Sequence, residues 1–520
     1  MQRRHFIGSL GALAASFSGL APAFAQNSGA GAGAGAGTHT ARSTGMPDLA
    51  QRLAAYAASL RYDDLDDATV ELAKTHLADA LGCGVAALNE RPVQIARKVA
   101  LAEGAAGAGK AGGNSSSNSS GKAGNGASTV LGTRLRTAPD MATFANGAAL
   151  RYYDLNDVYA GKEIGHPSDN ISACLAQAEA EGANGRDLIV AIVLAYEIDC
   201  RMMDAASISQ HGWDHPNFSL PAAALAAGKL MQLDQAQLTQ AVNLAINGHL
   251  ALNQTRVQTI SNWKGLADAD AARNGVFSAA LAREGLTGPS PIFEGDAGFF
   301  KQVSGPFTVD TASFGGRGRP FRIRDCSVKF YPAQALTQTA IEAGIDVAKQ
   351  AGGVERIAAV EIRTSHEGWF SAGMDAEKWA PETSGTADHS LPYVTARAMF
   401  DGDITVASYS QAALHDAKLR AFMKKIKVVD DPQMSQLYPK YYATVVTATR
   451  DDGQVFSKRV DDIPGSATRP MQRADFAAKF KKNVVPVLGA ASADEALGVL
   501  WELERRGSAS DVFAPLVLRS

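Results

Sequence analysis

Apolar residues recur at helical spacing through much of the first 300 positions. Residues 72–81 place their apolar side chains on one side of a helix. Residues 188–203 form a mostly apolar run that is too long for an ordinary strand and predicts a buried helix. Residues 222–233 and 238–252 continue the same pattern. The pattern from about position 48 to 304 therefore predicts an all-helical domain.

The pattern changes beyond position 320. Residues 321–328 and 360–362 have the composition and alternation of extended segments, whereas 333–351 has helical spacing. Residues 442–449 and 455–460 flank an Asp-Asp-Gly turn and predict a β-hairpin. The last fifty residues return to a helical pattern.

A chain of 520 residues favours more than one domain. We predict a mainly α fold, with a large all-helical domain and a smaller α+β domain. The predicted boundaries are 46–320 for the helical domain, 321–470 for the α+β domain, and 471–520 for C-terminal helices that return to the first domain.

The first 25 residues resemble an export signal. Arg3 and Arg4 form a twin-arginine pair, a short apolar stretch follows, and Ala23–Ala25 has the small-residue pattern of a cleavage site. We predict a Tat signal cleaved near Ala25 and a periplasmic mature protein. No later run is apolar and long enough to span a bilayer, so we expect no membrane association of the mature form.

Two segments have low complexity. Residues 26–45 contain a Gly-Ala repeat and predict a flexible leader. Residues 103–127 are largely glycine, alanine, serine and asparagine, which predicts a disordered insert because little apolar surface is available to bury.

The overall charge and the cysteines exclude several classes of partner. The chain has 50 basic and 53 acidic residues, a formal net charge of -3, which gives no sign of nucleic-acid binding. The four cysteines are scattered, without zinc or iron–sulfur spacing. We expect them to be buried free thiols, although an exported protein could also form a disulfide.

Residues 151–170, RYYDLNDVYAGKEIGHPSDN, concentrate polar chemistry. Asp154, His166 and two further aspartates lie within sixteen positions of a glycine-broken segment. Ser168 begins a Ser-Asp-Asn sequence that resembles a helix N-cap, and a helix start attracts carboxylate or phosphate groups. The segment is either a proton-transfer site for an acidic substrate or an ordinary loop before a capped helix.

His211 and His215 form an i, i+4 pair in the sequence SQHGWDHPNFS. This spacing permits a zinc site, but the HExxH pattern is absent, and Gly212 and Pro216 disfavour a helix there. We therefore predict no metal. A loop histidine that acts as an acid or base, or a structural histidine, fits the sequence better.

Two lysines have neighbours that suit anion binding. Lys264 lies beside Trp263 and near Arg256, directly before a helix of small residues. Lys329 lies near the predicted domain junction, where ligand sites often form. Lys264 could instead be a solvated surface lysine, which is the usual case.

The sequence Asp388-His389-Ser390 predicts a helix cap with a packed histidine rather than a catalytic group. No dinucleotide fingerprint, Walker loop, nucleophile elbow or EF-hand occurs in a fitting context.

Several of these segments together resemble the MmgE/PrpD family, which holds 2-methylcitrate dehydratases, cis-aconitate decarboxylases and related enzymes. The matching segments occur in order over nearly the whole chain after the signal: DLND with GHPSDN, GWDH, NWKGLADADAARNG, KFYPA and TADHSLPYV. Several multi-residue matches at fitting spacing are more specific than one short motif.

The resemblance implies a helical domain and an α+β lid with the active site between them, in a homodimer that uses no cofactor. It also implies that Asp154, His166, His215 and Lys264 are active-site residues and that Lys329 is a lid lysine facing the pocket.

The chain departs from the dehydratase-like pattern after the lid motif. That pattern is approximately PAEYHSQ, whereas Gln334 and Leu336 here replace its acid and its histidine. Leucine cannot exchange a proton, so this departure bears on the family's dehydration of 2-methylcitrate.

The hypothesis is a lyase that abstracts a proton next to a carboxylate of a small di- or tricarboxylic acid, with loss of water. Asp154, His166, His215 and Lys264 would be catalytic, and Arg256, Lys329 and Ser168 would bind the substrate. The alternatives are a decarboxylase or epimerase of the same family, or an exported carboxylate-binding protein without activity.

Overall fold

The computed structural model describes residues 47–108, 126–466 and 468–518, with only the backbone described for 103–108. The predicted export signal and leader lie outside this range. Helices predominate in the described part, as the apolar spacing predicts. Within that part, no helix is both long and apolar enough to cross a membrane.

One apolar core draws on residues 49–326 and 480–516. The predicted buried helix over 188–203 is confirmed by α6, whose start is capped by Asn184 and Asp187. The C-terminal helix α17 packs against α2 in this core. The helices that contribute are α1 (Leu49–Ser59), α2 (Asp67–Ala86), α3 (Arg91–Ala108), α4 (Pro139–Arg151), α5 (Ile171–Ala180), α6 (Gly185–Ala205), α7 (Pro216–Leu230), α8 (Gln235–Gly248), α9 (Ala267–Arg283), α17 (Arg473–Leu488) and α18 (Ala490–Trp501).

This part of the chain is not purely helical, contrary to the prediction. Strands β1 (Ser128–Thr129) and β2 (Arg136–Thr137) pair with each other. The glycine-broken segment forms β3 (Asp157–Ala160) and β4 (Ile164–Gly165), an antiparallel pair. Glycines and β-branched residues in these short stretches suit a tight strand reversal better than a helix.

Strand β5 (Ser327–Val328) pairs with β3, so that Val328 lies opposite Asp157. This pairing brings two segments about 170 positions apart into contact and places Lys329 next to the loop of Asp154. The prediction of an extended segment over 321–328 is wrong for its first part, because Arg322–Asp325 form a 3-10 turn. In this turn the N–H of Arg322 donates to the Glu197 carboxylate at 2.7 Å and not to a neighbouring strand.

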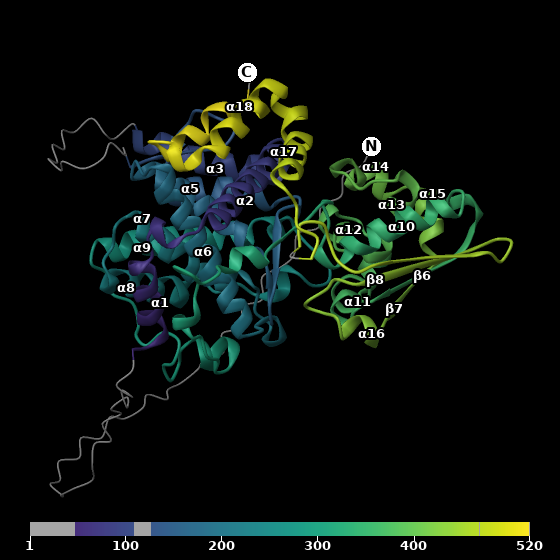
Figure 1. Cartoon of the computed structure of the whole chain (residues 1–520), viewed down its shortest axis with the longest axis horizontal. Coiled ribbons are helices and arrows are strands. Elements are labelled where there is room, and N and C mark those ends of the chain that lie inside the picture. The colour runs from purple at the N-terminus through teal and green to yellow at the C-terminus, as the bar shows by residue number, and fades with distance from the viewer. Residues whose placement is uncertain (1–46, 109–125, 467, 519–520) are drawn as a thin grey trace, which may run out of the picture. The chain divides into compact units, whose positions relative to one another are not determined.

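A second apolar core draws on residues 331–460. Its sheet has the strand order β7-β6-β8-β9, with helix α10 packed on β8 and β9 (Figure 1). The predicted β8–β9 hairpin is confirmed, and Gly453 in its turn has a φ of 84°. The elements are α10 (Gln338–Gln350), β6 (Ile357–Thr364), α11 (His366–Ala372), α12 (Ser384–Ala387), α13 (Leu391–Asp401), α14 (Gln411–Leu414), α15 (Ala417–Met423), β7 (Ile426–Asp430), α16 (Pro432–Ser435), β8 (Thr444–Arg450) and β9 (Val455–Val460).

The low-complexity insert is only partly described. Helix α3 extends to Ala108, so the insert predicted to be disordered from position 103 begins as helix. Residues 109–125 lie outside the described residues. All four cysteines are buried free thiols, as predicted, and the Sγ atoms of Cys200 and Cys326 lie 3.7 Å apart.

Candidate active site

Asp154 lies at the centre of a buried polar cluster. It follows α4 after two tyrosines, its φ angle is 53°, and its side chain is almost completely buried. A positive φ is uncommon outside glycine, although aspartate tolerates it better than most residues. The N–H of Asp154 donates to the carbonyl of Arg151 at 3.1 Å and closes the turn.

Arg151, Lys264 and Lys329 contact the Asp154 carboxylate from three parts of the chain. Arg151 and Lys329 both bind Oδ1, and Lys329 Nζ also donates to the carbonyl of Asp154 at 3.0 Å. Lys264 Nζ lies 3.5 Å from Oδ2. Burial alone would raise the pKa of Asp154, but the three cations hold it well below its ordinary value. Burial lowers the pKa of Lys329 to about 8.

His166 presents an unprotonated nitrogen to this cluster. Its Nδ1 lies 2.7 Å from the carbonyl oxygen of Asp157. Because a carbonyl can only accept, Nδ1 carries the proton and Nε2 keeps a free lone pair. Nε2 lies 3.9 Å from Asp154 Oδ1. Burial, together with Arg151 and Lys329, lowers the pKa of His166 well below its ordinary value, so the imidazole is neutral.

His215 lies behind His166. The two rings meet edge to face with centroids 5.3 Å apart, and His215 Nδ1 is 3.4 Å from Asp268 Oδ1. Burial lowers the pKa of His215 to about 4. The predicted pair His211 and His215 does not share a helix face, because helix α7 starts only at Pro216 and His211 is exposed. His215 thus packs against the ring of His166 and beside Asp268.

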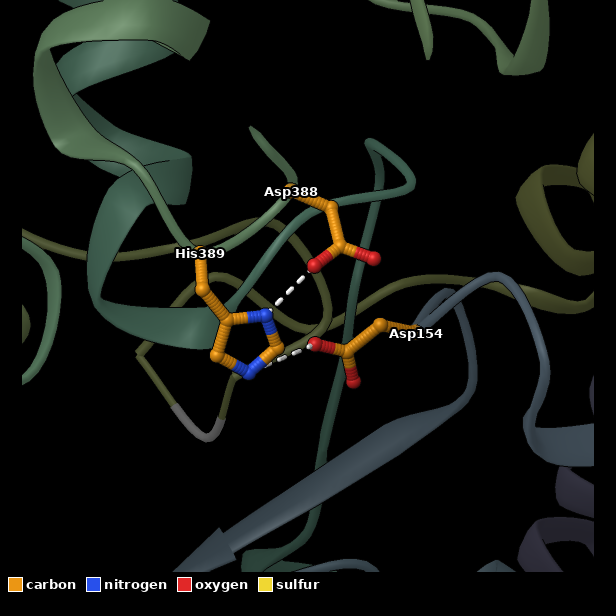
Figure 2. A group of neighbouring side chains, drawn as sticks. All are labelled: Asp154, Asp388 and His389. Carbon is orange, nitrogen blue, oxygen red and sulfur yellow. Dashed lines mark hydrogen bonds and ion pairs between the residues drawn. The ribbon is translucent and has the colours of Figure 1, made fainter. Parts of the chain in front are cut away.

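Asp388 and His389 join the cluster from the segment between α12 and α13. His389 Nδ1 donates to Asp388 Oδ1, and its Nε2 lies 3.7 Å from Asp154 Oδ2. Figure 2 shows the imidazole between the two carboxylates. Asp388 Oδ2 accepts from Lys264 at 3.1 Å. Burial lowers the pKa of His389 to about 4, and Lys264 contributes.

The predicted helix cap at this segment is correct only for Ser390, whose Oγ accepts from the N–H of Tyr393 at 3.1 Å. The expectation of a merely packed His389 is wrong, because its Nε2 faces Asp154. No local pattern distinguishes such a residue from a packed histidine. The only available signal was the match of TADHSLPYV to the family.

Arg256 was expected to bind substrate, but its guanidinium is bound to the protein. Its nitrogens donate to Asp214, Asp268 and the carbonyl of Lys264 at 2.9–3.1 Å. These bonds fix the backbone of Lys264 and the Asp268 carboxylate. The structure gives Arg256 a positioning role, and its binding of substrate stays a prediction.

Ser168 was expected to offer a helix start to an anion. Its N–H instead donates to Asp157 Oδ1 at 3.1 Å, and its Oγ accepts from Asn156 at 2.9 Å. Asn170, which precedes α5, makes no side-chain cap. The anion at this turn is Asp157 itself, so the predicted role of Ser168 is wrong.

A second carboxylate pair surrounds Arg151, another residue that the sequence did not single out. Arg151 Nε lies 3.4 Å from Asp268 Oδ2 and 3.6 Å from Asp169 Oδ2. Burial raises the pKa of Asp169 well above its ordinary value, and the negative charge of Asp268 adds to this effect. Burial would also raise the pKa of Asp268, but Arg256 and His215 hold it low.

Asp154, Asp388 and His389 offer ligand atoms within 4.8 Å of one another, a spacing that could hold a metal ion. Their oxygens are already bound by Arg151, Lys264 and Lys329. A divalent cation would have to displace these positive charges, so the donor set fits a metal poorly.

The chain matches two family models. The MmgE/PrpD N-terminal domain matches residues 51–312, and the MmgE/PrpD C-terminal domain matches residues 331–504. A 2-methylcitrate dehydratase of Cupriavidus necator is 27% identical over 408 residues, which cover 71% of this chain and 81% of that protein.

Two cis-aconitate decarboxylases are also similar. The protein of Mus musculus is 25% identical over 400 residues, 73% of this chain and 79% of its own length. The protein of Homo sapiens is 24% identical over 481 residues, 88% of this chain and 92% of its own length. With both domain models matched in order along the polypeptide, the chain belongs to the MmgE/PrpD family.

Proposed function

We propose that this protein is a cofactor-independent lyase that abstracts a proton next to a carboxylate of a small di- or tricarboxylic acid, with loss of water. The observation that carries the proposal is the arrangement of two neutral imidazoles, His166 and His389, whose Nε2 atoms lie 3.9 and 3.7 Å from Asp154. Lys264 and Lys329 lie at the same carboxylate.

His389 is the better base of the two. Its Nδ1 donates to the Asp388 carboxylate, whereas that of His166 donates to a neutral carbonyl. A carboxylate at Nδ1 orients the ring and stabilises the imidazolium that forms when Nε2 takes a proton. His166, whose Nε2 is also unprotonated, is the alternative base.

The lysines would stabilise the negative charge that builds up on the substrate carboxylate as the proton leaves. Lys329 also suits proton donation to a leaving hydroxyl, because its pKa of about 8 is close to neutral pH. Asp154 is too weak a base to abstract the proton next to the substrate carboxylate, because its pKa lies well below the ordinary value. Its role is to pair with both lysines and hold them at the site.

The two departures from the dehydratase-like pattern differ in their surroundings. Leu336 packs in an apolar cluster with Val158, Tyr442 and Ile463. Gln334 contacts the site segment, since its N–H donates to the carbonyl of Asp388 at 2.9 Å. Leu336→His should shift activity toward 2-methylcitrate if Leu336 only reshapes the pocket. No gain from this change would contradict that account.

The test is a panel of hydroxy and unsaturated di- and tricarboxylates incubated with the purified protein in heavy water. Loss of one water from the substrate mass would support the hydro-lyase, and loss of carbon dioxide the decarboxylase alternative. Deuterium uptake without mass loss would support an epimerase. Thermal stabilisation by the acids without exchange or turnover would favour a carboxylate-binding protein and contradict the lyase.

Export and assembly are further parts of the proposal. We propose a Tat-dependent periplasmic protein cleaved near Ala25, supported by Arg3 and Arg4. Replacing both arginines by lysine should retain the protein in the cytoplasm, as cell fractionation would measure. We also propose a homodimer, which light scattering of the purified protein would test.

A further inference from the structure

Lys378 is a buried lysine without a hydrogen-bond partner. It lies in the 3-10 turn Ala376–Trp379 and its side chain is 1% exposed. Among the described residues, its Nζ has no hydrogen-bond acceptor. A buried ammonium without a partner costs several kcal/mol, so such a group is rarely kept without a ligand.

The backbone of Lys378 is tied to the site segment. The Oγ of Ser390 donates to the carbonyl of Lys378, and Ser390 follows Asp388 and His389 directly. Burial lowers the pKa of Lys378 and Lys264 adds to this effect, while Asp388 is the strongest of the carboxylates that oppose it. Both oxygens of Asp388 are already bonded, to Lys264 and to His389, and neither accepts a hydrogen bond from Lys378.

The acidic residues around Lys378 do not hydrogen-bond its ammonium group. Asp388 of the site segment, and Asp375 and Glu377 of its own turn, act on it electrostatically, but none of them accepts a hydrogen bond from its Nζ. Lys378 therefore keeps unpaired donors beside the site segment.

We infer that Lys378 binds a second carboxylate of the substrate, so that the site selects di- and tricarboxylic acids over monocarboxylic acids. This inference rests on the proposed function and assigns the residue that binds the second carboxylate. One carboxylate binds at Lys264 and Lys329, where negative charge develops, and another binds at Lys378. A monocarboxylate leaves Lys378 unpaired and gains nothing there.

The test uses Lys378→Met in the full protein without its signal, with citrate and acetate as probes. Methionine has a similar length and no charge, so the unliganded variant should unfold at a higher temperature than wild type. Its affinity for citrate, measured by calorimetry, should fall roughly 10- to 100-fold, since a hydrogen bond between charged groups is lost. Affinity for acetate should stay unchanged.

Lys349→Met, at an exposed lysine of α10, is the matched control and should bind citrate like wild type. Lys378→Gln provides a second uncharged variant if the methionine protein does not fold. Unchanged citrate affinity in a folded Lys378 variant would overturn the inference while leaving the proposed function intact. Wild-type protein that binds no acid of the panel would instead overturn the proposed function, and the inference with it.

Discussion

Two aspartates three positions apart lie in two buried polar networks of opposite character. Asp154 contacts three cations and faces the unprotonated Nε2 atoms of two imidazoles. Asp157 accepts the N–H of Ser168 at 3.1 Å and lies 3.2 Å from Nδ1 of His76. Both are fully buried.

The Asp157 network continues into the helices. Lys479 on α17 donates to the carbonyl of Leu155 at 2.8 Å and pairs with Asp79 of α2 at 2.6 Å. The contacts of the Asp157 network hold the backbone of the loop between α4 and α5, whereas Asp154 lies among side chains that can exchange protons. The comparison teaches that burial and charge alone do not distinguish a candidate catalytic carboxylate from a structural one. A cluster of titratable side chains with shifted pKa values around the carboxylate is the better indication.

Asp154→Asn should have the largest effect on turnover. It removes the negative charge that pairs with Lys264 and Lys329. We expect kcat/KM to fall about 10,000-fold and the free energy of unfolding to fall by about 3–5 kcal/mol, because buried cations lose their partner. Steady-state kinetics and urea denaturation would measure the two effects. Near wild-type turnover would contradict the role of Asp154.

His389→Gln should lower kcat about 1,000-fold and leave substrate affinity nearly unchanged, because it removes the proposed base but no substrate-binding cation. His366→Gln is the matched control, since His366 is more than half exposed and bonds Asp430 on the surface of the same part of the chain. Equal losses in both variants would show a general effect on folding.

The pH dependence of kcat/KM should have two limbs. Activity should fall about tenfold per pH unit below pH about 4, where His389 becomes protonated, and above pH about 8, where Lys329 loses its proton. Lys329→Arg should shift the alkaline limb to higher pH, since arginine stays charged. An alkaline limb that does not move would exclude Lys329 as its source.

Lys479→Met should have the smallest effect on turnover, although its effect on stability is large. Removing Lys479 leaves Asp79 buried without its cation, so the free energy of unfolding should fall by about 3–5 kcal/mol. The kcat of the folded protein should stay within about twofold. Lys481→Met, at a half-exposed lysine of the same helix, should change neither quantity. Loss of turnover in folded Lys479→Met would show that the Asp157 network takes part in catalysis.

The sequence predicted the periodic elements well because helical spacing and a turn motif are local signals. Helix α6 and the β8–β9 hairpin are examples. It did not predict the β3–β5 pairing, which depends on tertiary contact between distant segments. That pairing, rather than any local pattern, brings Lys329 to Asp154.

The site could be predicted where a segment or a resemblance singled out the residue. The structure brings Asp154, His166, Lys264 and Lys329 together, with His215 directly behind. Asp388 and His389 were assigned to a cap because a capping serine follows them, and their approach to Asp154 is set by contacts more than 200 positions apart. The sequence did not reveal that aspartates bind Arg256 and Ser168, because these hydrogen bonds depend on how the loops fold and not on spacing along the chain.

The most direct measurement is the rate of deuterium incorporation into an accepted carboxylic acid by wild type, Asp154→Asn and Lys479→Met, each corrected for its folded fraction. The account predicts rapid exchange by wild type and by Lys479→Met, and no measurable exchange by Asp154→Asn. Equal exchange by Asp154→Asn and wild type, or loss of exchange in both variants, would contradict the division between the two networks.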